Sequence, residues 1–342
     1  MSDELLKPLL RRDPIVGRWV ISGRVDKNWT PEELKKFVEK HEKTGKNCPF
    51  CPGNEKMTPP EIMADRPQGG HPDTPGWRVR VVPNKYPALK IEGDLDKRGI
   101  GLYDMSNGIG AHEVIIETPD HFSELADISV DQIQKVIFAY KTRCLDLKKD
   151  PRFKYLLIFK NYGRVAGASL EHPHSQLIAL PIVPKRVREE LKGAHRYFDY
   201  RDRCIFCDII QQELYDRIRI VADNANFLAI APFVSRFPFE IWILPYNHSS
   251  DFSEIEGDEI ADLAQILKES LYRLKMALDD PPYNFIIHSA PVGDSNSEYY
   301  HWHIEIMPKI IKVAGFEWGS GFYINPTPPE LATEYLKAVE YK

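Results

Sequence analysis

Residues 170–181 read LEHPHSQLIALP and combine two histidines with an apolar run. His172, His174 and Gln176 stand at alternate positions of this stretch. Because side chains of a β-strand point to opposite faces with period two, these three share one face, whereas Leu177 and the residues in phase with it share the other. The spacing therefore predicts a strand with one apolar face and one face that carries two imidazoles and an amide.

The composition limits the class of protein. The chain has 342 residues, a length that is typical of about two domains. Apolar residues make up 43% and charged residues 28%, which predicts a soluble protein with sizeable cores. A net charge of −5 with both signs well mixed argues against a dedicated nucleic-acid binder. Because there is no run of about 18 apolar residues and the start, MSDELLKPLL, is charged, we expect a cytoplasmic protein without membrane contact.

Four of the five cysteines form two C-x-x-C pairs, Cys48 with Cys51 and Cys204 with Cys207. In a long chain without a signal peptide, such pairs more often bind metal or carry out redox chemistry than form structural disulfides. Cys144 is left over and lies in the helical pattern QIQKVIFAYKTRCLDL, where we expect a buried thiol.

Each cysteine pair is followed by a histidine and then by a His-x-His pair. Zinc takes four ligands in a tetrahedral array, and two cysteines with two histidines are a common structural set. We therefore predict two structural zinc ions per chain, held by Cys48, Cys51, His112 and His172 and by Cys204, Cys207, His248 and His301. The alternative is a set of reduced cysteines and scattered core histidines. His41, His71, His121 and His195 are expected on the surface.

The segments around these ligands follow the same order in both halves of the chain. In the first half GWRVRVVPN and HEVIIET precede a helix near 129–149, which is followed by YLLIFKN and HSQLIALP. In the second half FLAIAPF and FEIWILP precede a helix near 257–278, which is followed by YNFIIHSAP and HWHIEIMP. This order predicts an α+β fold built from a duplicated unit with antiparallel sheets. The charged stretch 184–203 is predicted to be a linking helix, and the domains are divided as 1–195 and 196–342.

His174 is the candidate nucleophile. If His172 binds zinc, its neighbour on the same face is held beside a rigid site, and a hydrogen bond at one ring nitrogen leaves the other free to attack phosphorus. Gln176 can donate a hydrogen bond to a phosphoryl oxygen, and the preceding loop KNYGRVAGAS offers Asn161, Ser169 and backbone amides for the same purpose. The alternative is that His174 is a second ligand or a core residue, which the flanking loop makes less favourable.

The motifs CPFC, HEVIIETPDH, FKNYGRVAGASLEHPHSQ, FPFEIWILP and HWHIEIMP follow one another along nearly the whole chain. Together they resemble the galactose-1-phosphate uridylyltransferase family, nucleotidyl transferases of the histidine-triad superfamily. The resemblance implies two half-barrel histidine-triad units and a ping-pong reaction. In it UDP-glucose gives its uridylyl group to His174, and galactose 1-phosphate collects the group as UDP-galactose. Asn161, Ser169 and Gln176 would hold the nucleotidyl phosphate, with Gln176 in the third triad position.

The resemblance implies further site residues. The first zinc set corresponds to Cys48, Cys51, His112 and His172, and a nucleoside-contacting asparagine corresponds to Asn84, with Phe50 and Tyr86 nearby for base packing. Arg24 resembles a phosphate-binding arginine, and Glu317 a partner of sugar hydroxyls. Family members are typically homodimers, and Arg24 is expected to act across the interface. Lys27 stands where a second arginine is common, which weakens bidentate contact with phosphate.

Other features leave the substrate open. The second Cys/His set is similar to that of a branch that includes ADP-glucose phosphorylase, which transfers an adenylyl group to inorganic phosphate. No glutamine follows Glu317, as it does in sugar-binding uridylyltransferases. The alternatives are an ADP-glucose phosphorylase or related adenylyl transferase, a nucleotide-binding sensor without catalysis, and a zinc hydrolase, which needs an open metal position. His301, His303 and Glu305 are interpreted as a decayed copy of the first triad.

Overall fold

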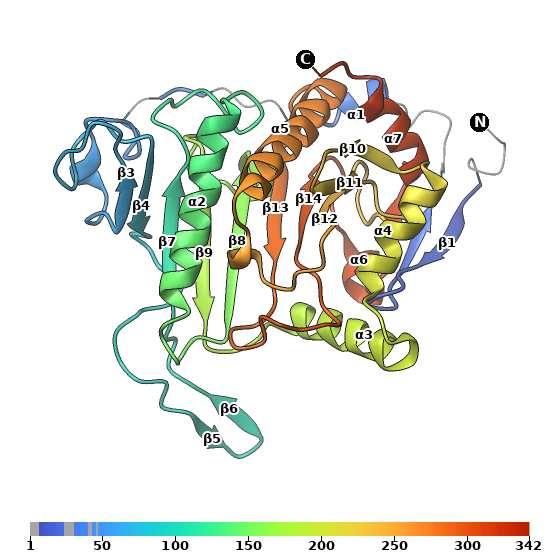
Figure 1. The fold of residues 1–342 in the computed structure, drawn as a ribbon, viewed down its shortest axis with the longest axis horizontal. Helices are drawn as coiled ribbons and strands as arrows, with labels where there is room; N and C mark the ends of the chain where they lie inside the picture. Colours follow the sequence, from blue (N-terminus) through green and yellow to red (C-terminus); the bar gives the residue numbers. More distant parts are fainter. Residues whose placement is uncertain (1–6, 24–30, 40–42, 46, 342) are drawn as a thin grey trace.

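A ten-stranded antiparallel sheet forms the body of the protein in the computed structural model, which describes residues 7–23, 31–39, 43–45 and 47–341 (Figure 1). The first half of the chain contributes β3 (Met63–Asp65), β4 (Val79–Pro83), β7 (Ala111–Ile116), β8 (Tyr155–Tyr162) and β9 (His174–Leu180). The second half contributes β10 (Ile220–Asp223), β11 (Phe227–Ile230), β12 (Ile241–Pro245), β13 (Tyr283–His288) and β14 (His303–Pro308). The α+β class with antiparallel pairing is therefore confirmed.

The two halves meet at the pair β8 and β13, where Tyr162 lies opposite Tyr283. The full strand order is β10-β11-β12-β14-β13-β8-β9-β7-β4-β3. On either side of the central pair the strands follow one another in the same order, so that β9 corresponds to β14, β7 to β12 and β4 to β11. The predicted duplication is confirmed, and it produces one continuous open sheet rather than two separate ones.

Two long helices, α2 (Val130–Leu147) and α5 (Asp258–Leu278), lie side by side on one face of this sheet (Figure 1). The Ser129 hydroxyl caps α2 by accepting a hydrogen bond from the Gln132 amide. The apolar stripe of each helix packs on the apolar residues of the strands, which gives the main core. Both helices occupy the predicted ranges. Since they cover one face, the other face of the sheet is left for the site.

The linking helix is α3 (Lys185–Arg201), and it leads into α4 (Ile205–Asp216). The predicted domain division between residues 195 and 196 falls inside α3 and stays a prediction.

A small sheet joins the two ends of the chain, because β15 pairs with β2 in parallel and β1 pairs with β2. The remaining elements are β1 (Leu9–Arg12), β2 (Trp19–Ser22), α1 (Pro31–Lys35), η2 (Glu55–Met57), β5 (Arg98–Ile100), β6 (Tyr103–Met105), η3 (Arg164–Ala166), η4 (Phe252–Glu254), α6 (Gly315–Ser320), β15 (Tyr323–Asn325) and α7 (Pro329–Lys337). Among the described residues, no helix combines the length and apolarity needed to cross a bilayer.

Candidate active site

His174 begins β9, and its side chain is buried at the end of the strand. Its Nδ1–H donates to the backbone oxygen of His172 at 2.8 Å, which fixes the tautomer and leaves a lone pair on Nε2. Within the described part of the chain, this Nε2 has no hydrogen-bond partner. Burial lowers the pKa of His174 to about 4, so the ring is neutral at physiological pH. A neutral imidazole with a fixed tautomer and a free lone pair can act as a nucleophile.

The alternate residues of β9 point toward the helices, as the period-two spacing predicts. Ser175, Leu177 and Ala179 are each 0% exposed. The Tyr140 hydroxyl of α2 donates to Ser175 Oγ at 2.7 Å, which ties this side of the strand to the helix. The predicted division into an apolar face and a face with His174 and Gln176 is confirmed for β9, but His172 lies before the strand begins and is not part of it.

The loop between β8 and β9 closes over the same end of the strand. Gly163 and Gly167 have φ of 83° and 93°, a region that residues with a side chain rarely adopt. Asn284 Nδ2 of β13 donates to Asn161 Oδ1 at 2.8 Å and to the Ala166 oxygen at 2.8 Å. With its oxygen occupied in this way, Asn161 is left with its NH₂ group as a donor. The cavity beside this loop measures ≈770 Å³ and is lined by Asn161, Arg164, Ser169, His172 and His174, among others.

Gln176 is oriented by residues of the neighbouring strands. Its Oε1 lies 2.7 Å from His112 Nε2 and 3.4 Å from Asn84 Nδ2. The Ala88 amide donates to His112 Nδ1 at 3.2 Å, so His112 carries its proton on Nε2 and donates it to Gln176. Because the oxygen of Gln176 is occupied, its NH₂ group is the part available to a phosphoryl oxygen.

The prediction that His112 is a metal ligand is therefore wrong. The structure gathers Cys48, Cys51 and His172 with His121 instead. The antiparallel register explains the difference, because His174 pairs with Ile116 and the chain at His172 therefore meets residues beyond the end of β7. His112 lies four residues before Ile116, about 13 Å along the strand. His121, which was predicted to be on the surface, is only 7% exposed.

The geometry of this first cluster fits zinc. Its four ligand atoms lie within 4.8 Å of one another, and Cys51 Sγ is 3.4 Å from His121 Nδ1 and 3.6 Å from His172 Nδ1. Tetrahedral zinc with bonds of about 2.0–2.3 Å separates its ligand atoms by about 3.5 Å. His172 Nε2–H donates to the Thr118 oxygen at 2.8 Å, which turns the Nδ1 lone pair toward the cluster. Burial raises the pKa of the Cys51 thiol to about 11, and a bound cation would stabilise the thiolate.

The second cluster repeats the first. The predicted ligands Cys204, Cys207, His248 and His301 all come together within 4.8 Å. Cys207 Sγ is 3.4 Å from His248 Nδ1 and 3.6 Å from His301 Nδ1. The Nε2 atoms of the two histidines face backbone oxygens, Ser297 at 3.1 Å and Pro245 at 3.0 Å. The predicted juxtaposition of this set is confirmed, and either cluster could hold a zinc ion with four protein ligands.

The copy of the triad in the second half keeps the backbone arrangement of the first. His303 Nδ1 donates to the His301 oxygen at 3.1 Å, as His174 does to His172. The Phe206 ring of the second C-x-x-C pair packs on His303 with centroids 4.9 Å apart, and the corresponding distance in the first half is 5.4 Å. The cavity beside His303 is only ≈90 Å³, which is too small for a nucleotide.

A buried cluster of charges lies in front of His303. The His303 and His288 rings stack with centroids 4.7 Å apart, and Glu190 and Glu305 lie within 3.1–3.3 Å of the two His288 nitrogens. Burial alone would lower the pKa of His288, but the charges of the two glutamates outweigh it and raise the pKa to about 10. Ligand atoms of Glu190, His288 and His303 also lie within 4.8 Å of one another. The second triad is therefore occupied by protein groups rather than open to substrate.

Family comparisons agree with this duplicated architecture. The N-terminal domain of galactose-1-phosphate uridyl transferase matches residues 1–184, and the C-terminal domain of the same family matches residues 190–321. The chain belongs to the galactose-1-phosphate uridyl transferase family. Members of this family transfer nucleotidyl groups, and the chain is an enzyme of this kind.

Two relatives and two solved structures place the chain within the family. It is 36% identical to ADP-glucose phosphorylase of Arabidopsis thaliana, over 99% of this chain and 95% of the relative, and 28% identical to galactose-1-phosphate uridylyltransferase of Thermotoga maritima, over 97% and 98%. The structure of the Arabidopsis ADP-glucose phosphorylase with bound ADP-glucose superposes with a TM-score of 0.81 at 36% identity, over 98% of this chain and 100% of that chain. A uridylyltransferase structure superposes with a TM-score of 0.75 at 31% identity, over 96% and 97%.

Among the described residues, Glu317 is one that the family resemblance implies and that does not lie near His174. Arg24 and Lys27 lie outside the described residues. Glu317 lies on α6, which packs beside β15 on the far side of the molecule from β9 (Figure 1). Phe50 is 7% exposed and packs its ring edge against His174, whereas Tyr86 is 82% exposed. Of the two aromatic candidates for base packing, Tyr86 has the accessible surface.

Three residues around the two triads were not predicted from the sequence. The repeat itself contained a signal for His121. In the second half the ligand His248 follows the end of β12, and in the first half His121 follows the end of β7, the strand that corresponds to β12. Asn284 had a weaker signal, an asparagine in a strand otherwise rich in apolar residues. Glu190 lies in the charged linking helix, where nothing distinguishes it from the exposed charges around it.

Proposed function

We propose that the protein transfers a nucleotidyl group from a nucleoside-diphosphate sugar through a covalent intermediate on His174. The observation that carries the proposal is the free Nε2 lone pair of His174 beside the ≈770 Å³ cavity and its glycine-containing loop. In the first step Nε2 forms a bond to the α-phosphorus and the bond to the β-phosphate side breaks, so that the sugar 1-phosphate leaves. In the second step an acceptor phosphate oxygen attacks the same phosphorus and His174 leaves as neutral imidazole.

Neutral donors would stabilise the charge on the phosphoryl oxygens during both steps. The NH₂ groups of Asn161 and Gln176 are presented by partners that occupy their oxygens. Ser169 lines the cavity and offers a hydroxyl. Gln176 cannot act as an acid or base, so this position of the triad supplies no general base to activate water, which suits an intermediate that waits for the acceptor.

The two Cys/His clusters are proposed to hold structural zinc. Each supplies four protein ligands and so has no open position for a reacting water, which argues against a zinc hydrolase. In the first cluster a bound ion would cross-link His172 to residues far away in the chain and thereby anchor the start of β9.

We favour transfer of an adenylyl group from ADP-glucose to inorganic phosphate as the finer reaction. The higher identity to the Arabidopsis ADP-glucose phosphorylase, 36% against 28% for the Thermotoga uridylyltransferase, supports it, as does the second Cys2His2 cluster. The alternative is the galactose-pathway reaction of UDP-glucose with galactose 1-phosphate, supported by the full-length similarity to uridylyltransferases.

A homodimer is proposed to complete the sugar side of the site. Glu317 is remote from His174 of its own chain, so its proposed contact with sugar hydroxyls requires a second subunit. Arg24 is proposed to act across the same interface. Mixed dimers of Arg24→Ala and His174→Ala subunits would therefore test this arrangement. If each site draws Arg24 from the partner, one subunit pair regains an intact site and activity returns on mixing; no recovery in a verified mixed dimer would contradict it.

The experiment for the main proposal uses ADP-glucose and UDP-glucose labelled at the α-phosphate and no acceptor. Label is expected on the protein from ADP-glucose, and inorganic phosphate should remove it. His174→Ala should take no label, whereas a variant of the exposed His71, His71→Ala, should label normally. Label that survives in His174→Ala contradicts the nucleophile, and label only from UDP-glucose favours the alternative reaction. A non-catalytic sensor would take no label from either donor.

A further inference from the structure

A buried lysine lies beside the backbone of the nucleophile and belongs to the wall of the same cavity. Lys160 of β8 is 1% exposed and points to the helix side of the sheet, opposite to its neighbour Asn161. Its Nζ donates to Glu117 Oε2 at 2.7 Å and lies 3.2 Å from Glu124 Oε2. Burial alone would lower the pKa of Lys160, but the charges of the two glutamates outweigh it and raise the pKa, so the ammonium stays charged.

The same buried group reaches the backbone that carries the nucleophile. Lys160 Nζ lies 3.4 Å from the backbone oxygen of His174. The Glu117 amide donates to the Pro173 oxygen at 3.1 Å, and Ser175 Oγ is held by Tyr140, which also contacts Glu117 at 3.4 Å. Three consecutive residues, 173 to 175, are thus fastened to one network centred on the Lys160–Glu117 pair.

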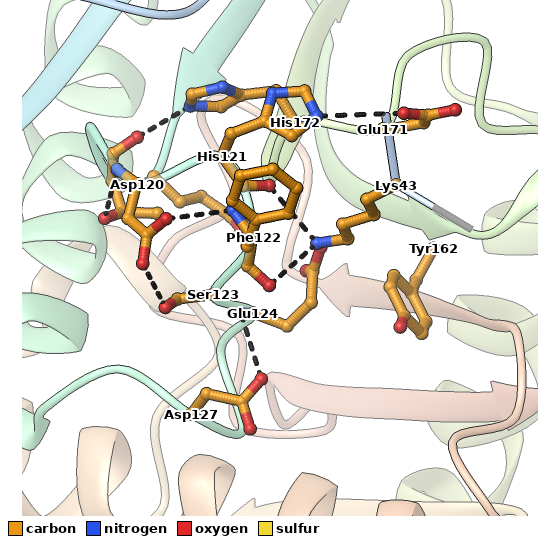
Figure 2. A network of polar contacts seen from close by, with 12 residues as sticks. Lys43, Asp120, His121, Phe122, Ser123, Glu124, Asp127, Tyr162, Glu171 and His172 are labelled. Carbon is orange, nitrogen blue, oxygen red and sulfur yellow. Dashed lines mark hydrogen bonds and ion pairs between the residues drawn. The ribbon is translucent and has the colours of Figure 1, made fainter. Parts of the chain in front are cut away.

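The charge of this network is balanced by a second lysine, Lys43, at the wall of the cavity. Lys43 Nζ donates to Glu124 Oε1 at 2.5 Å and lies 3.4 Å and 3.3 Å from the backbone oxygens of His121 and Phe122 (Figure 2). Two lysines and two glutamates give a net charge of zero. Without Lys43, the buried group would carry an excess negative charge beside a site for anionic substrates, where the charge is poorly screened.

We propose that Lys160 is a positioning residue for His174, and that Lys43 supports this role by neutralising Glu124 and fixing the loop that carries His121. The proposal rests on the proposed function, because it assigns these lysines to the geometry of the attacking imidazole. Both lysines line the ≈770 Å³ cavity, but this role requires no contact with substrate. Lys160 fixes the backbone of the nucleophile, and Lys43 links the first Cys/His cluster to the same network.

The test measures the single-turnover rate of protein labelling by ADP-glucose and UDP-glucose in Lys160→Met, Lys160→Arg and Lys43→Met. Since a misplacement of about 1 Å costs about 100-fold in rate, Lys160→Met is expected to slow labelling about 10- to 100-fold at saturating donor, and Lys43→Met about 3- to 10-fold. The donor concentration for half-maximal rate should change less than about threefold. Lys160→Arg, which keeps the charge, should recover part of the rate.

Lys141→Met is the matched control. The Lys141 side chain is 16% exposed against 13% for Lys43, and it likewise contacts a glutamate and a backbone oxygen, at Glu256 and Ile255. It lies in α2 away from the cavity, so its removal should leave the labelling rate unchanged. An unchanged saturating rate in Lys43→Met, or a loss as large in Lys141→Met, would overturn the proposal even if Lys160→Met fails to fold.

A second readout separates this proposal from the proposed function. Diethyl pyrocarbonate acylates neutral imidazole, and the rate at His174 can be followed by mass spectrometry with the exposed His71 as internal reference. The rate at His174 should change more than about threefold in Lys43→Met while His71 is unaffected. If the protein without substitutions takes no label from either donor, the proposed function fails. An acylation rate at His174 that is unchanged in Lys43→Met would overturn the positioning role separately.

Discussion

Replacing Asn284 by alanine tests whether the second half of the chain supports catalysis in the first. The Asn284 side chain makes two hydrogen bonds of 2.8 Å, to Asn161 Oδ1 and to the Ala166 oxygen. At about 1 kcal/mol each, their loss should lower the free energy of unfolding by about 2 kcal/mol. The Asn161 amide would also be free to rotate. Removing one oxyanion donor outright costs about 100- to 1,000-fold, so a donor that is present but misoriented should slow nucleotidyl transfer about 10- to 100-fold.

The assay is the single-turnover rate of labelling at saturating donor, together with thermal unfolding. Asn226→Ala is the control, because Asn226 is also half-buried in the second half and donates to Asp262 Oδ2 at 2.7 Å, away from the cavity. It should lose about 1 kcal/mol of stability and keep its rate. A rate for Asn284→Ala within about twofold of the parent, or an equal loss of rate in Asn226→Ala, would refute the reasoning.

Three further predictions follow from the geometry. His121→Ala should lower the zinc content by one ion per chain, whereas His112→Ala should retain the metal and slow labelling about tenfold through a loosened Gln176; equal metal loss in both, measured by mass spectrometry of the metals, would contradict this. The raised pKa of His288 predicts an imidazolium whose contribution to stability is complete below about pH 6.5 and lost as the pH rises through about 10. His288→Gln should therefore cost up to about 4 kcal/mol at pH 7, progressively less as the pH rises from 7 toward 10, and almost nothing above pH 10; a gap in stability that does not narrow over this range would argue against it. The Cys144 thiol, whose pKa burial raises to about 12, should react with iodoacetamide only after unfolding, which peptide mapping checks.

Much of the fold was predictable because its signals are local. The period-two alternation of residues 174–180 and the helical spacing in α2 and α5 depend only on neighbours in the chain, and the structure confirms them. The repeated order of cysteines and histidines also predicted the second cluster correctly. The strand and helix patterns are local, and the Cys/His set was found because its order repeats along the chain; neither needs knowledge of which strand pairs with which.

The errors came from contacts that depend on strand register. His112 and His121 lie nine residues apart, and only the pairing of His174 with Ile116 decides which of them reaches the cysteines. Asn284 joins the site because β13 pairs with β8 across the two halves, which the prediction of separate units did not contain. Contacts between strands far apart in sequence carry no spacing signal of their own.

The central claim is that His174 Nε2 forms a covalent bond to the nucleotidyl phosphorus. The most direct measurement is peptide mass spectrometry after incubation with the sugar nucleotide alone, under conditions that preserve a phosphoramidate. The account predicts one nucleotidyl group per chain, located on His174, that disappears when the acceptor phosphate is added. A nucleotidyl group on any other residue, or transfer to the acceptor with no modified His174 at any time, would contradict it.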